Sequence, residues 1–242
     1  MMQNISCNFR TLLNKAKAVL LASCLLHPGS WVSAQELHEP SRWDNDIATF
    51  AAMDAANPPP EGAIVLVGSS SIARWNDQAE AALAPLNVIP RGFGGSVMGD
   101  VLHHLDNVVL RYEPRAVLIY EGDNDTAYNV PTDTILDQLQ QIIARVHEEL
   151  PETRIYLLGV KPSILRWNIF DRAQLVNAGY QLIASADPLV TYVDTVNPFL
   201  NANGMVMDDI FVGDNLHFND MGNLIWGSVI RAALMPEEIR FE

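Results

Sequence analysis

The chain has 242 residues, of which 49% are apolar and 18% charged, a composition typical of a globular protein and not of a disordered one. Its formal net charge is −14, from 29 acidic and 15 basic residues. An acidic surplus of this size disfavours nucleic acids and anionic membranes as partners, because both repel a negative surface.

The first 34 residues have the pattern of a secretory signal peptide. Three basic residues precede a short apolar run, residues 18–26, and small side chains end the segment at Ala34. The pattern predicts export to the periplasm or the medium, with cleavage after Ala34. The apolar run is too short to span a bilayer, so no stable membrane insertion is expected. A Leu-Ala-Ser-Cys sequence ending at Cys24 makes anchoring as a lipoprotein the alternative.

Removal of residues 1–34 changes the balance of the chain. The segment carries three of the basic residues, no acid and both cysteines, so the remaining chain has a net charge of −17. That chain has no disulfide, no thiol nucleophile and no cysteine metal ligand.

Residues 35–61 are expected to form an N-terminal segment that leads into the main domain. A helix is predicted from Trp43 to Ala55, and the three prolines at 58–60 end it.

Residues 62–242 alternate between strand-like and helical patterns. Apolar runs bounded by glycines or polar residues predict five strands, at residues 63–67, 86–89, 115–120, 154–160 and 191–193. Apolar residues at three- and four-residue spacing predict helices at residues 101–112, 132–150, 172–184 and 221–234. The alternation predicts an α/β fold with a parallel sheet of about five strands covered on both faces. Ligands of such sheets bind beyond the carboxyl ends of the strands.

Four polar or glycine-rich blocks fall at those ends: Gly68-Ser69-Ser70-Ser71, Arg91-Gly92-Phe93-Gly94-Gly95-Ser96, Glu121-Gly122-Asp123-Asn124-Asp125 and Asp214-Asn215-Leu216-His217. Each block alone is typical of a turn or a helix cap. Together they supply a nucleophile, oxyanion donors, a base and a group that orients the base, which is what an acyl-transfer site needs.

The four blocks resemble those of the SGNH, or GDSL-type, hydrolase superfamily, and the resemblance covers most of residues 62–228. It implies a three-layer, flavodoxin-like α/β/α sandwich. It also implies a catalytic triad of Ser70, His217 and Asp214 and an oxyanion hole made by the backbone N–H groups of Ser70 and Gly95 and the side-chain amide of Asn124.

One position departs from the family pattern. The aspartate that precedes the nucleophile in the family is Ser69 here, and the Gly-Ser-Ser-Ser-Ile form is similar to a known subgroup. Of the three adjacent serines, the register from Gly68 selects Ser70.

Several other groups have a functional and a structural interpretation. His103 and His104 lie near Asp100 and Asp106, but adjacent histidines on a helix point about 100° apart, so no metal is expected. Asp125 is expected to brace its loop. The roles of two larger sets of residues stay open. Lys161, Ser163 and Arg166 either line the pocket or belong to a solvated loop. Phe93, Met98, Trp167 and Phe211 form either an apolar acyl pocket or part of the core.

The sequence therefore predicts a GDSL-type esterase that cleaves small-molecule carboxylic esters through an acyl-enzyme, without a cofactor. Short loops after the strands and the lack of a lid-like insertion favour short acyl chains, although the apolar side chains of residues 197–212 offer cover for a longer one. A carbohydrate O-acetylesterase with the same triad is one alternative. A non-catalytic module that binds phosphate or sulfate at the Gly-Ser turn is another.

Overall fold

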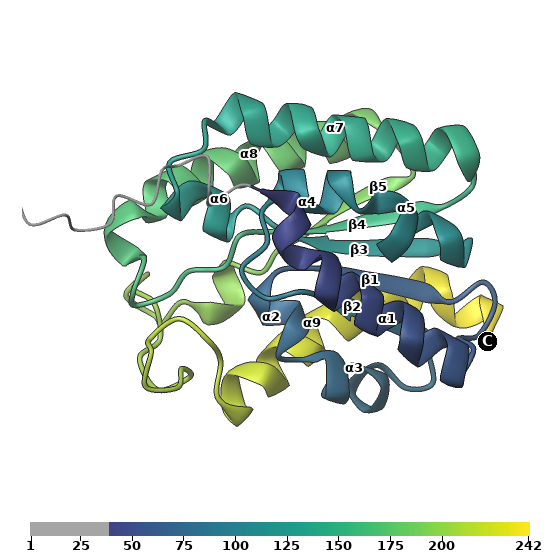
Figure 1. The fold of residues 1–242 in the computed structure, drawn as a ribbon. Coiled ribbons are helices and arrows are strands. Elements are labelled where there is room, and N and C mark those ends of the chain that lie inside the picture. The colour runs from purple at the N-terminus through teal and green to yellow at the C-terminus, as the bar shows by residue number, and fades with distance from the viewer. Residues whose placement is uncertain (1–38) are drawn as a thin grey trace, which may run out of the picture. The chain divides into compact units, whose positions relative to one another are not determined.

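The computed structural model describes residues 39–242, which form a five-stranded sheet between two layers of helices (Figure 1). All neighbouring strands are parallel, in the order β2-β1-β3-β4-β5. This confirms the predicted flavodoxin-like α/β/α sandwich. The strands are β1 (Ile64–Gly68), β2 (Val88–Gly92), β3 (Ala116–Tyr120), β4 (Arg154–Leu158) and β5 (Val190–Val193).

The central strands are apolar throughout because both of their faces are buried. Successive side chains of a strand point to opposite faces. Val65 and Val67 of β1 accordingly lie in one core cluster, and Ile64 and Leu66 lie in the other.

Nine α-helices occur in residues 39–242: α1 (Asp44–Ala56), α2 (Ser70–Ala73), α3 (Asn76–Leu83), α4 (Met98–His103), α5 (Leu105–Val108), α6 (Asp123–Ala127), α7 (Thr132–Glu149), α8 (Phe170–Ala186) and α9 (Asp220–Glu238). Helices α1, α4, α5, α7 and α8 contribute to the first core cluster, and α2, α3 and α9 contribute to the second. Figure 1 shows α7 and α8 on one side of the sheet and α3 and α9 on the other. Short 3₁₀ helices lie at Pro40–Trp43, Leu110–Tyr112, Trp167–Ile169, Asn197–Phe199 and Ile239–Phe241.

Most predicted elements differ from the structure by a few residues at their ends, and two differ for an identifiable physical reason. The second strand runs over Val88–Gly92 and so includes Pro90 and Arg91. Proline is tolerated there because β2 is an edge strand. The single helix predicted over residues 101–112 is broken at His104 and Val109, whose backbones leave the helical conformation. The apolar face stays buried across both breaks, and the periodicity detects only that face.

The segment before the sheet packs onto the domain. Phe50 of α1 is buried in the first core cluster, and Asp54 pairs with Arg91 of β2 and accepts a 2.6 Å hydrogen bond from the hydroxyl of Tyr112. Trp43 donates through its indole N–H to Asp100 at 3.0 Å. Residues 40–56 therefore belong to the same folded unit as the sheet. Of the helices in residues 39–242, none has the length and apolar composition needed to cross a bilayer.

Candidate active site

The first polar block forms a sharp turn between β1 and α2. Gly68 ends β1 with φ +147°, and a Cβ there would lie 2.2 Å from the backbone oxygen of Tyr120, so no other residue fits. Ser69 is buried and directly precedes α2. Its carbonyl oxygen accepts the first backbone hydrogen bonds of that helix, from Ile72 and Ala73. Ser70 is the first residue of that helix, so its backbone N–H has no partner within the helix.

Ser70, His217 and Asp214 lie in one hydrogen-bonded row, although Ser70 and His217 are 147 residues apart in the sequence. The Oγ of Ser70 is 2.8 Å from Nε2 of His217. Nδ1 of His217 is 2.7 Å from Oδ2 of Asp214. These distances are those of a nucleophile in contact with a base, and of a base in contact with the carboxylate that orients it.

Asp214 is fixed by its own loop. Its Oδ1 accepts the backbone N–H groups of Leu216 and His217, each at 2.9 Å. Partial desolvation raises the pKa of Asp214, but these bonds and the contact with the His217 ring outweigh it and hold that pKa below its ordinary value. Asp214 is therefore a carboxylate at neutral pH.

Desolvation lowers the pKa of His217 below the ordinary value of 6.5, and the positive charges of Arg74 and Lys161 act in the same direction. The hydrogen bond to Asp214 opposes them without reversing the shift. The imidazole is thus neutral at pH 7. With Nδ1–H directed at Asp214, its Nε2 is free to accept the Ser70 proton.

The second block brings a glycine turn against Ser70. A Cβ at Gly94 would lie 3.8 Å from the Cβ of Ser70, so the backbone of this turn passes directly beside that residue. Gly95 has φ +89°, and its carbonyl accepts a 3.3 Å hydrogen bond from Arg42. A Cβ at Gly95 would meet the ring of Trp43 at 3.4 Å. The N-terminal segment therefore supports the predicted oxyanion glycine.

The third block begins α6 and carries Asn124, which is 5% exposed. Its side-chain Nδ2 donates to the backbone oxygen of Ser96 at 2.9 Å, which links the block to the glycine turn. Asp125 accepts the backbone N–H groups of Met98 and Gly122, each at 3.0 Å, as expected for a residue that braces its loop. Burial raises the pKa of Asp125 to about 6, although these two bonds oppose the rise.

Three basic side chains surround these blocks. Arg74 is the residue that ends α2, one turn after Ser70, and its guanidinium lies 3.7 Å from Oδ2 of Asp214. Lys161 and Arg166 follow β4; Lys161 donates to the carbonyl of Leu216 at 2.7 Å, and Arg166 donates to Oδ1 of Asn124 at 2.9 Å.

Lys161 and Ser163 are 2% and 1% exposed, so the loop after β4 is not the solvated one considered from the sequence. Arg74 was not predicted, although its spacing of four residues from Ser70 places it on the same helix face.

The four residues considered for an acyl pocket are divided between the two core clusters. Phe93 and Met98 are buried in the first core cluster, and Trp167 stacks on Phe170 at its edge. Phe211 is buried in the second cluster, where it stacks on Phe218. The core-packing interpretation is therefore the one that the structure supports.

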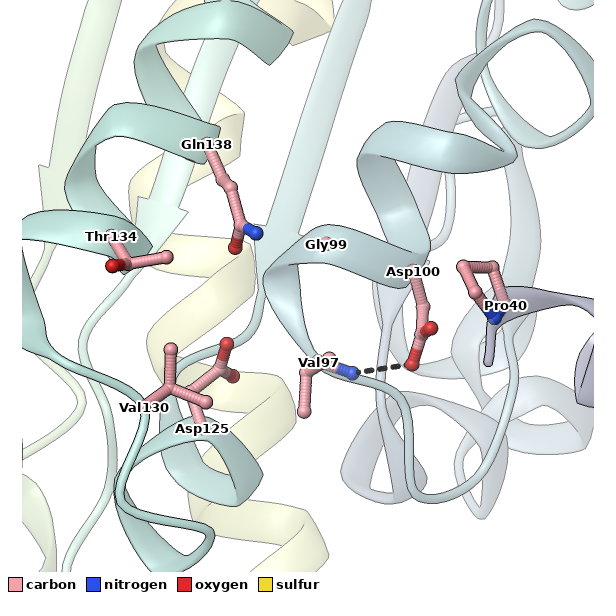
Figure 2. A pocket seen from close by; sticks show the side chains of 8 residues that line it. All are labelled: Pro40, Val97, Gly99, Asp100, Asp125, Val130, Thr134 and Gln138. Atoms are coloured by element: carbon pink, nitrogen blue, oxygen red, sulfur yellow. Dashed lines mark hydrogen bonds between the residues drawn. The ribbon is translucent and has the colours of Figure 1, made fainter. Parts of the chain in front are cut away.

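A hollow of about 320 Å³ lies between α4 and α7 (Figure 2). None of its lining residues is a triad residue: they are Pro40, Val97, Gly99, Asp100, Asp125, Val130, Thr134 and Gln138. The two carboxylates in it already accept protein donors. Asp125 is bonded as described above, and Asp100 accepts the backbone N–H of Val97 and the side chains of Arg42 and Trp43.

His104 and Asp106, two of the residues considered for a metal, have other partners. Nε2 of His104 lies 2.9 Å from the carbonyl of Pro40, and Asp106 pairs with Arg145. Within residues 39–242, no group of three or more His, Cys, Asp or Glu is placed to hold a metal ion.

A flavodoxin-like sheet whose strand ends bring together a Gly-Ser turn, a glycine turn, an Asn-Asp block and an Asp-x-x-His block has the fold of the SGNH hydrolases. The sequence profile of the GDSL-like lipase/acylhydrolase family matches residues 59–225, so the chain belongs to that family. It is a GDSL-type carboxylic ester hydrolase, and its substrate is a small-molecule ester.

Solved structures share the fold at low sequence identity. A GDSL-like lipase from Bacteroides thetaiotaomicron is 21% identical with a TM-score of 0.67, over 78% of this chain and 97% of that one. An acetylxylan esterase, Axe2 from Geobacillus stearothermophilus, is 14% identical with a TM-score of 0.58, over 71% and 93%. A Streptococcus pneumonia protein named for platelet activating factor is 21% identical with a TM-score of 0.70, over 84% and 99%. Among curated proteins, no significant match is found.

Proposed function

We propose that the enzyme cleaves short-chain carboxylic esters through an acyl-enzyme on Ser70, with His217 as general base and Asp214 as the group that orients it. The observation that carries this proposal is the unbroken row of contacts from Ser70 Oγ to His217 Nε2 and from His217 Nδ1 to Asp214. A serine hydroxyl is a weak nucleophile at neutral pH and needs such a base.

The reaction has two halves. Ser70 Oγ attacks the ester carbonyl carbon while its proton passes to His217 Nε2, and the tetrahedral intermediate collapses as His217 returns the proton to the leaving alcohol. Water then attacks the acyl group, again losing its proton to His217, and the acid leaves as Ser70 is restored. The oxyanion of each intermediate is stabilised by the backbone N–H groups of Ser70 and Gly95 and by the Asn124 amide, in positions implied by the family pattern.

The preference for short acyl chains is supported by the surroundings of the triad. The apolar side chains that would form a deep acyl tunnel are packed in the two core clusters. Two exposed apolar residues, Leu165 and Val212, donate backbone hydrogen bonds to the loop that carries His217. They are 55% and 36% exposed. Contacts with such surface residues improve the binding free energy by about 0.8 kcal/mol for each of the first few methylenes of the acyl chain. Methylenes beyond these make no further contact.

A fluorophosphonate probe tests the nucleophile. Mass spectrometry is expected to place one adduct on Ser70, and Ser70→Ala is expected to abolish both labelling and turnover while the unfolding temperature is unchanged. An adduct on Ser69 or Ser71 would contradict the assignment. The alternative of a non-catalytic phosphate-binding module is not retained, because the family is one of ester hydrolases.

A series of p-nitrophenyl esters, assayed below their micelle concentrations, tests the chain length. We expect kcat/KM to rise from acetate over the first few carbons and to fall beyond about six, as contact with the surface runs out. A higher value for palmitate than for butyrate would refute the short-chain proposal. Acetylated xylan belongs in the same screen, because the fold is shared with an acetylxylan esterase. Release of acetate from it at a higher kcat/KM than from p-nitrophenyl acetate would favour the carbohydrate O-acetylesterase.

We also propose that the enzyme is exported, with its mature chain beginning at Gln35. The predicted leader lies outside the described residues, and the proposal rests on its sequence pattern alone. N-terminal sequencing of the exported protein tests it. A lipid-modified Cys24 as first residue would instead establish a membrane anchor.

A further inference from the structure

We propose that Arg166 is a positioning residue of the oxyanion hole, whose guanidinium fixes the side-chain amide of Asn124 so that one of its N–H groups is available to the oxyanion. The inference rests on the function proposed above, in which Asn124 stabilises the negative oxygen of the Ser70 adduct. It concerns a residue that is 42 positions from Asn124 in the sequence.

The amide of Asn124 has a partner at each end. Its Oδ1 accepts a hydrogen bond from Nη2 of Arg166 at 2.9 Å, and its Nδ2 donates to the backbone oxygen of Ser96 at 2.9 Å. A reversed amide would place N–H groups against the guanidinium donors and an oxygen against the Ser96 carbonyl, so both contacts would become repulsive. A primary amide has two N–H groups, which leaves one for a substrate oxygen.

Arg166 is itself held in place. Its Nη1 lies 2.7 Å from Oδ1 of Asp123, and its backbone N–H donates to the hydroxyl of Ser163 at 3.3 Å. Asp123 and Asn124 are consecutive residues at the start of α6, so one guanidinium contacts both side chains. Because only 17% of the Arg166 side chain is exposed and its charge is matched by Asp123, it is a poor site for a substrate anion.

The charge of Arg166 also strengthens the donor. A hydrogen bond from a guanidinium is charge-assisted, and it draws electron density toward Oδ1 of Asn124. Hydrogen bonds in a chain polarise one another, so the remaining Nδ2–H becomes a better donor. Lysine would keep the charge but lose the planar fork that contacts two groups at once.

The test is a double-mutant cycle with p-nitrophenyl acetate as substrate. We expect Arg166→Met to lower kcat about 10- to 100-fold with little change in KM, less than or equal to the loss from removing an oxyanion donor. In an Asn124→Ala background the same change is expected to have no further effect, because Arg166 acts through Asn124. Arg166→Lys should recover only part of the kcat.

Arg172→Met is the matched control, because Arg172 also bonds the α6 region, at the carbonyl of Thr126 (3.5 Å) and the side chain of Asn129, but not Asn124. It is expected to leave kcat unchanged. Independent, multiplying losses in the Arg166 and Asn124 variants would overturn the inference, and so would a rise in KM at constant kcat.

Unfolding temperatures are measured for every variant. If Arg166→Met does not fold, Arg166→Lys is taken through the same cycle. Activity retained by Ser70→Ala would refute the proposed function itself, which is a different outcome from an Arg166 variant with no effect.

Discussion

Replacing Lys161 by methionine is expected to remove a pH-dependent part of the stability and to lower the activity. Lys161 is 2% exposed, its ammonium lies 4.7 Å from the centre of the Phe218 ring, and it donates to the carbonyl of Leu216 at 2.7 Å. Desolvation lowers its pKa from 10.5 to about 8. At about 1.4 kcal/mol for each pKa unit, charged Lys161 disfavours the folded state by roughly 3 kcal/mol.

The sign follows from the proton balance. Below pH 8 both states hold the proton, and the folded state carries the full cost. Between about pH 8 and 10.5 the folded state has released the proton while the unfolded state keeps it, so the stability rises with pH. In Lys161→Met this rise is absent. At pH 7 the variant escapes the desolvation cost but leaves the Leu216 carbonyl without its donor, which costs about 1–3 kcal/mol, so the two effects largely cancel.

The activity changes for a different reason. Leu216 directly precedes His217, and Lys161 ties that part of the loop to the end of β4. Without the bond, we expect the imidazole to be held less firmly against Ser70 and kcat/KM to fall about 10- to 100-fold, since a displacement near 1 Å can cost that much. Lys161→Gln is the matched variant: it is uncharged but keeps a donor for Leu216, so it should lose the pH-dependent stability and retain more of the activity.

The assay is urea unfolding of the wild type and both variants at several pH values from 7 to 9.5, together with ester hydrolysis at pH 7.5. The free energy of unfolding of the wild type should gain about 2 kcal/mol relative to both variants as the pH rises to 9.5. Comparison between proteins removes the contribution of the tyrosines, which is common to all three. Parallel stability curves for wild type and Lys161→Met would show that the ammonium is not destabilised by its surroundings.

Three further predictions concern other parts of the molecule. Because desolvation lowers the pKa of His217, kcat/KM should fall only below pH 6.5 in a pH–rate profile. Arg74→Gln should move that fall to higher pH, because it removes a positive charge that also lowers the pKa of His217. A fall centred above pH 7 in the wild type would contradict this. Glu238→Gln should lower the free energy of unfolding by about 3 kcal/mol, because Glu238 is buried and accepts hydrogen bonds from Arg115, Arg154 and Tyr156. Glu237→Gln, at an exposed position, is the control and should change it little. Equal effects of the two changes would refute the explanation by a buried network. Asn219→Ala should cost about 1 kcal/mol, because its side chain caps α9 through the N–H of Gly222; an unchanged unfolding midpoint would count against the cap.

The central strands were predictable because they are continuous apolar runs, and the long helix α7 because its apolar residues recur at three- and four-residue spacing. The bounds of an element were harder to predict where its polar residues bind partners far away in the sequence. From the sequence, Arg91 was expected to follow the second strand. In the structure β2 continues through Arg91, because Asp54 of α1 neutralises its guanidinium. That partner is 37 residues away, and no local pattern indicates it.

The same limit applies to the site. Ser70, Asp214 and His217 were predicted as a triad from short blocks with recognisable sequences, and the structure brings the three side chains into contact. The supporting contacts join single residues from separate blocks, such as Lys161 with Leu216, which are 55 residues apart. Nothing in the sequence near Lys161 indicates which carbonyl its ammonium meets, so these contacts could be identified only from the folded chain.

The placement of the basic residues compensates for the acidity of the chain. A net charge of −17 on the residues after the predicted leader would oppose the growth of negative charge on a substrate oxygen. At the site, however, Arg74 lies beside Asp214 and Arg166 beside Asp123, while the ammonium of Lys161 lies beneath the His217 loop. The carboxylates of Asp214 and Asp123 are thus matched locally by cations. Because nearby charges in a partly buried site act more strongly than distant, solvent-screened ones, the field at the proposed oxyanion position is set by these pairs and not by the net charge of the surface.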